Sequence, residues 1–184
     1  WRMHQYGLTM SIDKNTNPVI ISLDAVIAMT DISRRTWWRR IEKGNVTKLP
    51  ADARGRTMLV FEEIRSSIAL QLGDDDVEML ILADGGDALA QAEAGAMFAL
   101  VNQNAKKMAS PLADSFYKTA LYWLELAAAQ EQADAMHWLS ILHSTCDVDG
   151  NSRSLSLMWL ARASVSGHAI ARAQIEAITA FPRG

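Results

Sequence analysis

The sequence predicts a mainly α-helical protein built from two units, and three observations lead to this prediction. Between residues 18 and 72, two short helical stretches precede a β-hairpin pattern. From residue 73 onward, alanine-rich helical segments recur with a spacing of about 36 residues. Residues 19–72 carry a net charge of +3, whereas residues 73–184 carry −7. This split predicts two units with different partners.

The overall composition excludes several protein classes. The chain has 184 residues, of which 49% are hydrophobic and 21% charged, as expected for a folded soluble protein. Its apolar runs, such as Met79–Ala83 and Ala96–Val101, are far shorter than the roughly 20 residues that span a membrane. One cysteine, Cys146, allows no intrachain disulfide, which favours the cytoplasm. Because Trp1 is no initiator residue, residues 1–17 are expected to be a leader, disordered or foreign to the native chain.

The first unit is expected to begin with two short helices. Ser22 is a candidate N-cap for a helix over Leu23–Met29, and the three residues that follow favour a turn. Ser33 is a second candidate N-cap, ahead of a helix over Arg34–Lys43, and Gly44 suits the position after its end. Two helices joined by a tight turn form a helix-turn-helix.

The second of these helices has two distinct faces. Trp37 and Ile41 are four residues apart and are expected to pack inward, while Arg35, Trp38 and Arg39 point elsewhere. A recognition helix needs such a face, because its arginines must reach phosphates and guanine edges.

A β-hairpin with a basic tip follows. Val46–Pro50 and Thr57–Val60 are expected to form its strands, and residues 51–56 its tip. Another helix is expected from Phe61 or Glu62.

The segment from Ile21 to Ile64 resembles the winged helix-turn-helix of MerR-type regulators, AlpA-like regulators and phage excisionases. The resemblance rests on the residues from Ser33 to Ile41 and on Gly44, Pro50, Gly55, Arg56, Phe61 and Ile64. It implies DNA contacts from Ser33, Arg34, Arg35, Thr36, Trp38 and Arg39 in the recognition helix and from Lys48, Arg54 and Arg56 in the wing. The alternative is a small helical domain whose arginines form a solvated face.

The second unit is expected to start at Gly73–Asp76, which interrupts the helical pattern and caps the next helix. Ala120–Ala127 recurs as Ser156–Ala163, an offset of 36 residues, and the match continues from Ala133 to Ala169. A degenerate earlier copy begins at Gly86, with an offset of 45 and a longer loop over Asn102–Pro111. A rival register pairs residues 94–97 with 133–136; we prefer the first, which keeps a glycine before the helix.

The period and the W-L-x-x-A core resemble Sel1-like repeats, relatives of the tetratricopeptide family. The resemblance implies a protein-interaction scaffold over residues 73–184, after a DNA-binding domain over residues 18–72. The last helix, Ala169 to about Ala180, presents Ile170, Ile175 and Ile178 as a candidate self-association surface.

No catalytic, cofactor or metal site is expected. Asp147–Asn151 resembles a calcium loop, but Ser152 and Met158 stand at two positions that such a loop reserves for Gly and Glu. His143 and Cys146 supply two ligand types, which do not make a metal site.

The predicted function is that of a bacterial transcriptional regulator that binds double-stranded DNA in the cytoplasm, at the nucleoid. The repeats would bind a partner protein or a second copy. A homodimer is expected because a single small DNA-binding domain contacts few base pairs. The alternatives are an excisionase-like architectural recombination factor and a protein adaptor without DNA binding.

Overall fold

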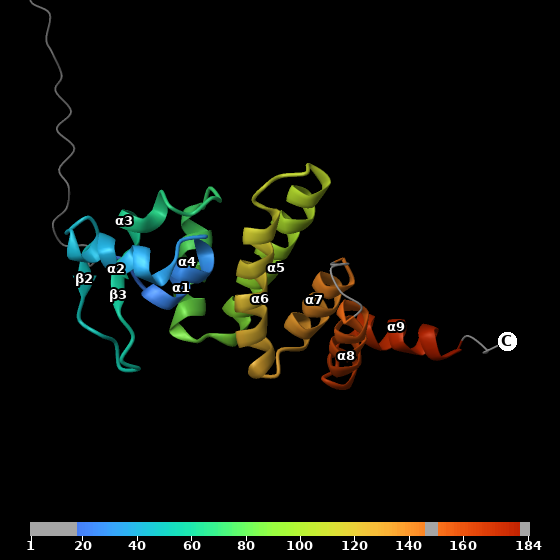
Figure 1. The fold of residues 1–184 in the computed structure, drawn as a ribbon. Helices are drawn as coiled ribbons and strands as arrows, with labels where there is room; N and C mark the ends of the chain where they lie inside the picture. Colours follow the sequence, from blue (N-terminus) through green and yellow to red (C-terminus); the bar gives the residue numbers. More distant parts are fainter. Residues whose placement is uncertain (1–17, 146–150, 181–184) are drawn as a thin grey trace, which may run out of the picture.

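The computed structural model describes residues 18–145 and 151–180 of the chain. The small N-terminal unit lies at one end of the molecule, and paired helices lead away from it to α9 at the other end (Figure 1). The described part is mainly helical and contains one small antiparallel sheet, which confirms the predicted fold class at this level. Across the described ranges, no helix combines the length and the apolarity needed to cross a membrane. The predicted leader, Cys146 and Asp147 lie outside the described residues.

The N-terminal unit combines three helices with a three-stranded sheet. The elements are β1 (Ile20–Ser22), α1 (Leu23–Met29), α2 (Arg34–Glu42), β2 (Lys48–Leu49), β3 (Met58–Val60) and α3 (Phe61–Arg65). The sheet order is β1-β3-β2, so the predicted hairpin is present and β1 is an additional strand. The β-branched run from Val19 to Ile21 was the available signal for β1.

The expected caps fix the ends of both early helices. Ser22 Oγ accepts a hydrogen bond from the backbone N–H of Ala25 at 3.2 Å. Ser33 Oγ accepts the backbone N–H of Thr36 at 3.3 Å, so α2 starts at the predicted residue. Gly44 has a φ of 72°, a left-handed conformation that suits glycine after a helix end.

The helical half is a succession of helices, each packed on the next. Its helices are α4 (Asp74–Gly85), α5 (Ala88–Lys107), α6 (Ala113–Ala129), α7 (Ala133–Ser144), α8 (Ser152–Val165) and α9 (Ala169–Ala180). Helices α7 and α9 start 36 residues apart and have 12 residues each, and α6 and α8 also end 36 residues apart. Helix α5 starts 45 residues before α7, which is the offset of the preferred register.

The extra length of the first copy lies mainly in a helix, and our expectation of a loop over Asn102–Pro111 was wrong. Helix α5 continues through Asn102 to Lys107, and the connection to α6 is short. The Asn102 side chain is buried and donates a hydrogen bond from Nδ2 to the carbonyl oxygen of Ala113 at 2.6 Å. The helix therefore persists because its last turns pack against the start of α6.

Several register-equivalent positions of the repeat are buried alike, although Trp159 is half-buried where its counterpart Trp123 is fully buried. Leu124 and Leu160 are both buried, as are the alanine pairs 127 and 163 and 135 and 171. Small residues let the helices approach closely. A Cβ atom on Gly95 of α5 would lie 2.5 Å from Cγ of Leu124 on α6.

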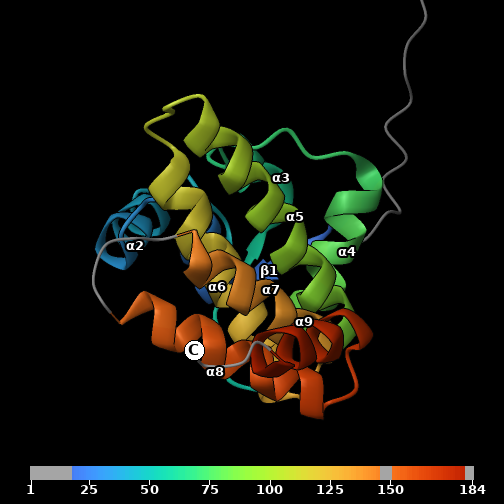
Figure 2. The ribbon, with the colours of Figure 1, turned by 90° about the vertical axis from the view of Figure 1, so that its right-hand side faces the viewer.

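The two halves share one continuous apolar core, which extends from Ile21 to Ala171. Thr119 of α6 donates a hydrogen bond to the carbonyl oxygen of Ala28 in α1 at 2.8 Å. Figure 2, which looks along the molecule from the α9 end, shows the helical pairs in front of the N-terminal unit. The segments 18–72 and 73–184 are therefore packed together rather than joined by a linker.

Candidate nucleic-acid interface

The buried face of α2 fixes which of its side chains reach solvent. Trp37 is fully buried, as predicted, and its indole Nε1 donates to Thr30 Oγ1 at 3.2 Å. Arg40 lies over the Trp37 ring at 4.7 Å and donates to Ser67 Oγ at 3.1 Å. Ile41 is half-buried against the same core. This packing anchors one side of α2 and turns the opposite side outward.

The outward side of α2 carries Arg35 and Arg39, and Lys43, the C-cap residue of the helix, extends them into a stripe of three cations. Their spacing of four residues places them on one helical face, and all three are exposed. None of the three side chains makes a hydrogen bond or ion pair with any described residue. Lys43 was absent from the residues that the resemblance implied, although the spacing was a signal for it. We call Arg35, Arg39 and Lys43 the α2 basic stripe.

The first turn of α2 is held by its own neighbours. The hydroxyl groups of Ser33 and Thr36 are hydrogen-bonded to each other at 3.0 Å. Arg34 forms an ion pair with Asp24 of α1, and both side chains remain about half exposed. These residues flank the basic stripe, but their side chains already have hydrogen-bond or ion-pair partners within the protein.

Trp38 is half-buried against the core, so our expectation of an exposed side chain was wrong. The reason is the hairpin: Nζ of Lys48, on β2, lies 5.1 Å from the centre of the Trp38 ring. The contact places the Lys48 ammonium beside α2. Two of the predicted site residues are thereby brought together.

The arginines of the hairpin tip fold back onto α4. Arg56 forms ion pairs with Asp52 at 2.8 Å and with the buried Asp84 at 2.7 Å. Burial alone would lower the pKa of the Arg56 guanidinium, but its hydrogen bond to Asp52 and the charges of Asp84 and Asp52 raise it. Arg54 donates to the backbone carbonyl oxygen of Gly85 and has no carboxylate partner among the described residues.

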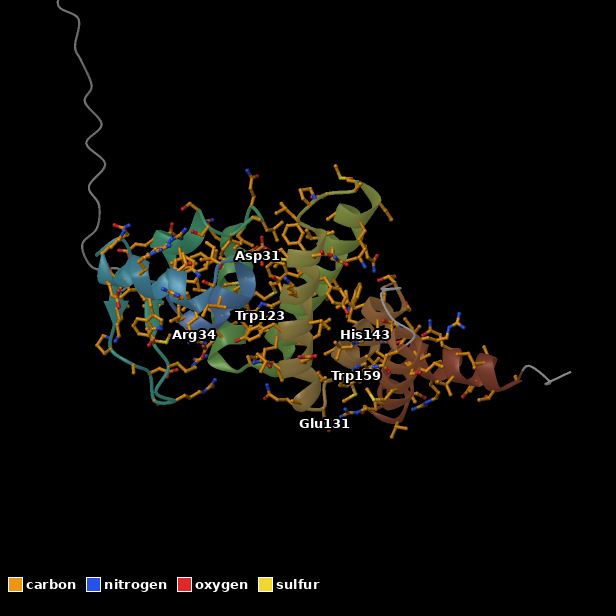
Figure 3. All side chains as sticks on the ribbon, in the orientation of Figure 1. Asp31, Arg34, Trp123, Glu131, His143 and Trp159 are labelled. Carbon is orange, nitrogen blue, oxygen red and sulfur yellow. The ribbon has the colours of Figure 1, made fainter. Side chains whose placement is uncertain are left out.

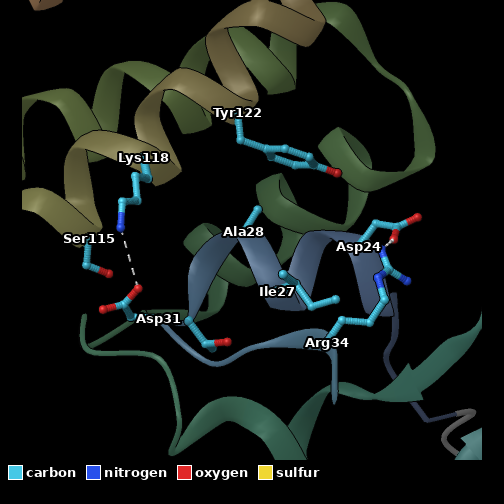
Figure 4. Close-up of a pocket in the computed structure, with 9 residues that line it drawn as sticks. Asp24, Ile27, Ala28, Asp31, Arg34, Ser115, Lys118 and Tyr122 are labelled. Atoms are coloured by element: carbon cyan, nitrogen blue, oxygen red, sulfur yellow. Dashed lines mark hydrogen bonds and ion pairs between the residues drawn. The ribbon is translucent and has the colours of Figure 1, made fainter. Parts of the chain in front are cut away.

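A groove of about 540 Å³ lies where α1 and α2 meet α6 (Figure 4). The Arg34–Asp24 pair lies at one end, and Lys118 of α6 approaches Asp31 at 3.8 Å at the other. Figure 3 shows Trp123 of α6 close to this junction, and its side chain is fully buried. The groove therefore lies between the start of α2 and the helical half.

The described residues contain no group of three or more His, Cys, Asp or Glu side chains placed to hold a metal ion. The absence of metal, cofactor and catalysis stays a prediction, since Cys146 and most of the calcium-like segment lie outside these residues. Comparison of the chain with models of known protein families, with curated protein sequences and with solved structures finds no match in any of the three.

Proposed function

We propose that the chain is a bacterial, sequence-specific DNA-binding transcriptional regulator of the cytoplasm. In this proposal α1, α2 and the β2–β3 hairpin act as a winged helix-turn-helix, with α2 in the major groove. The observation that carries the proposal is the α2 basic stripe, whose three cations have no partner among the described residues while Trp37 anchors the opposite face. Unpaired exposed cations along one helix are a surface suited to the DNA phosphate backbone.

The stripe supplies two kinds of contact. An arginine can donate two hydrogen bonds to the O6 and N7 atoms of guanine, so we assign base contacts to Arg35 and Arg39. Lys43 at the helix end, and Lys48 beside Trp38, carry compact charges suited to phosphates. The ring of Trp38 supports the Lys48 ammonium and does not itself enter the groove in this proposal.

The remaining predicted contacts have auxiliary roles. Ser33 and Thr36 offer hydroxyl groups to phosphates near the start of α2, and Arg34 can exchange Asp24 for a phosphate. Arg54 stays a candidate phosphate contact because its partner is a neutral carbonyl group. We leave Arg56 out of the interface, because two carboxylates already surround its guanidinium.

The helical half is proposed to bind protein as a Sel1-like repeat and to make the regulator a homodimer. The regular 36-residue offset of α6–α7 and α8–α9 supports a repeat. Ile170 and Ile178 of α9 are exposed, whereas Ile175 is half-buried. The exposed pair is the candidate contact between copies.

A protein adaptor without DNA binding is the second candidate. The adaptor is favoured because three of the predicted DNA-binding cations, Arg34, Arg54 and Arg56, already have partners within the protein. The two functions differ in whether the α2 basic stripe binds duplex DNA.

The test is a fluorescence-anisotropy titration with the full-length protein of a labelled duplex that carries a site selected by the protein from a randomised pool. We expect Arg35→Ala, Arg39→Ala and Lys43→Ala each to weaken binding about 5- to 100-fold, the range for a lost base or phosphate contact. The matched control is Arg153→Ala on α8, which removes an exposed cation far from α2 along the chain and should bind like the wild type. Equal binding by all four variants would remove the stripe from the interface and favour the adaptor.

A further inference from the structure

The N-terminal end of α9 is capped by a histidine. Nδ1 of His168, the residue before the helix, accepts a hydrogen bond from the backbone N–H of Ala171 at 3.1 Å. This N–H belongs to the first turn, whose donors lack partners within the helix. Ser, Thr, Asp and Asn usually fill this role, and none of them changes charge between pH 5 and 8 as histidine does.

The His168 ring is also packed against α7. It stacks on the ring of His137, with centroids 4.1 Å apart, and its Nε2 lies 3.5 Å from Asp134 Oδ1. His137 Nε2 in turn lies 3.1 Å from Oε1 of Gln174, one and a half turns into α9. The cap and the stacked pair thus fasten the first turns of α9 to α7.

Only the neutral imidazole can form this cap. The Nδ1 atom that accepts from Ala171 must carry no proton, so the proton of the neutral ring is on Nε2, which faces Asp134. Protonation turns Nδ1 into a donor that opposes the Ala171 N–H across 3.1 Å. It also adds positive charge at the positive end of the α9 dipole.

The surroundings of the ring oppose its protonation overall. Burial and the neighbouring His137 hold the pKa of His168 below its usual value of 6.5, and the Asp134 carboxylate acts in the other direction. The ionisable groups whose charges act on the ring are Asp134 and His137, and both lie on α7 rather than α8. Arg172, four residues after His168, adds another positive charge near the start of α9.

We propose that His168 is an acid-sensitive latch, which holds α9 against α7 and α8 when neutral and frees the first turn of α9 when protonated. The inference is independent of DNA binding. The stability that the neutral ring adds is complete above pH 6.5 and is lost as the pH falls through the lower pKa of the folded state. Release would uncover Ala171, which the docked helix buries completely.

Hydrogen exchange of the full-length protein tests the latch, with protection factors corrected for the intrinsic pH dependence of exchange. Between pH 7.5 and pH 5, we expect protection of residues 169–180 to fall about fivefold or more, as for the loss of one N-cap. Helix α5 serves as the internal reference and should keep its protection. His168→Asn supplies a cap that does not titrate, so it should keep protection at both pH values.

Two further variants separate the cap from the stack. His168→Ala should show low protection of α9 already at pH 7.5, with little further loss at pH 5. His137→Gln keeps the cap and removes the stacked ring, so the protection of α9 should still fall in acid. An equal loss in the wild type and in His168→Asn, or no loss in the wild type, would overturn the latch.

Discussion

Arg56 and Asp84, 28 residues apart in the chain, join the hairpin tip to helix α4 through an ion pair of 2.7 Å. The same carboxylate accepts hydrogen bonds from the backbone N–H of Ser22 at 2.8 Å and from Ser22 Oγ at 2.6 Å. Asp84 therefore fixes the wing and the N-cap of α1 at once. A residue of the helical half holds the proposed DNA-binding unit in shape.

Asp84→Ala should lower the free energy of unfolding by about 3 kcal/mol, because it leaves two buried Ser22 donors without their acceptor and removes one of the two carboxylates that pair with Arg56. Chemical denaturation of the full-length protein measures this cost. The matched control is Glu62→Ala, which breaks the Glu62–Arg65 pair of 3.2 Å on the surface and should cost under about 1 kcal/mol. Equal costs for the two variants would show that the Asp84 network is not a special support.

Gly95→Ala should destabilise the protein by about 1–3 kcal/mol, although alanine favours helices, because the new Cβ would overlap the Leu124 side chain. Gly85→Ala, also in a helix, meets no atom within 4 Å and should be neutral or stabilising by up to about 1 kcal/mol. Thermal unfolding of both variants makes the comparison. A stable Gly95→Ala protein would mean that α5 and α6 are packed less closely than described.

The two adjacent tryptophans of α2 should respond differently to truncation. Trp37→Ala removes a fully buried ring and a hydrogen bond to Thr30, which should cost about 3–5 kcal/mol. Trp38→Ala should cost less, because its ring is half-buried, and should weaken DNA binding by releasing Lys48. Denaturation and anisotropy titrations of each variant measure the two effects. A larger loss of stability for Trp38→Ala than for Trp37→Ala would contradict this account, because it would mean that the Trp38 face of α2 is the buried one.

Tyr122 should resist ionisation well beyond the usual range for tyrosine. Burial, and after it the charges of Asp84 and Asp24, raise its pKa from 10 to about 12. The neutral phenol therefore contributes stability that is complete below pH 10 and is lost as the pH rises towards 12. The difference in ultraviolet absorbance between the wild type and Tyr122→Phe during a pH titration isolates this group. A titration midpoint near pH 10 would contradict this prediction, because it would mean that the Tyr122 hydroxyl group is exposed to solvent.

Local features of this fold could be predicted from the sequence, and contacts between distant segments could not. Ser22, Ser33 and Gly44 act on neighbouring backbone atoms, so their side-chain chemistry alone located the helix ends. The repeat offset was also visible, because small and apolar residues recur at equivalent positions, several of which are buried alike.

The errors concern contacts between different elements of the fold. The exposure of Trp38 depends on Lys48, which reaches it from a different element. The inward direction of Arg56 depends on Asp84, which the sequence places in the other half. Charge patterns identify cations but do not show which of them a distant carboxylate neutralises, so only the structure separates Arg56 from Arg39.

Selection of binding sites from a randomised pool of duplex DNA, at a fixed and moderate salt concentration, tests the central claim most directly. The account predicts that full-length wild-type protein enriches a defined motif. Arg39→Ala should lose preference at one position of that motif, whereas Lys43→Ala should weaken binding without changing it. Failure of the wild type to retain duplex DNA, or retention without any enriched motif, would contradict sequence-specific reading by α2.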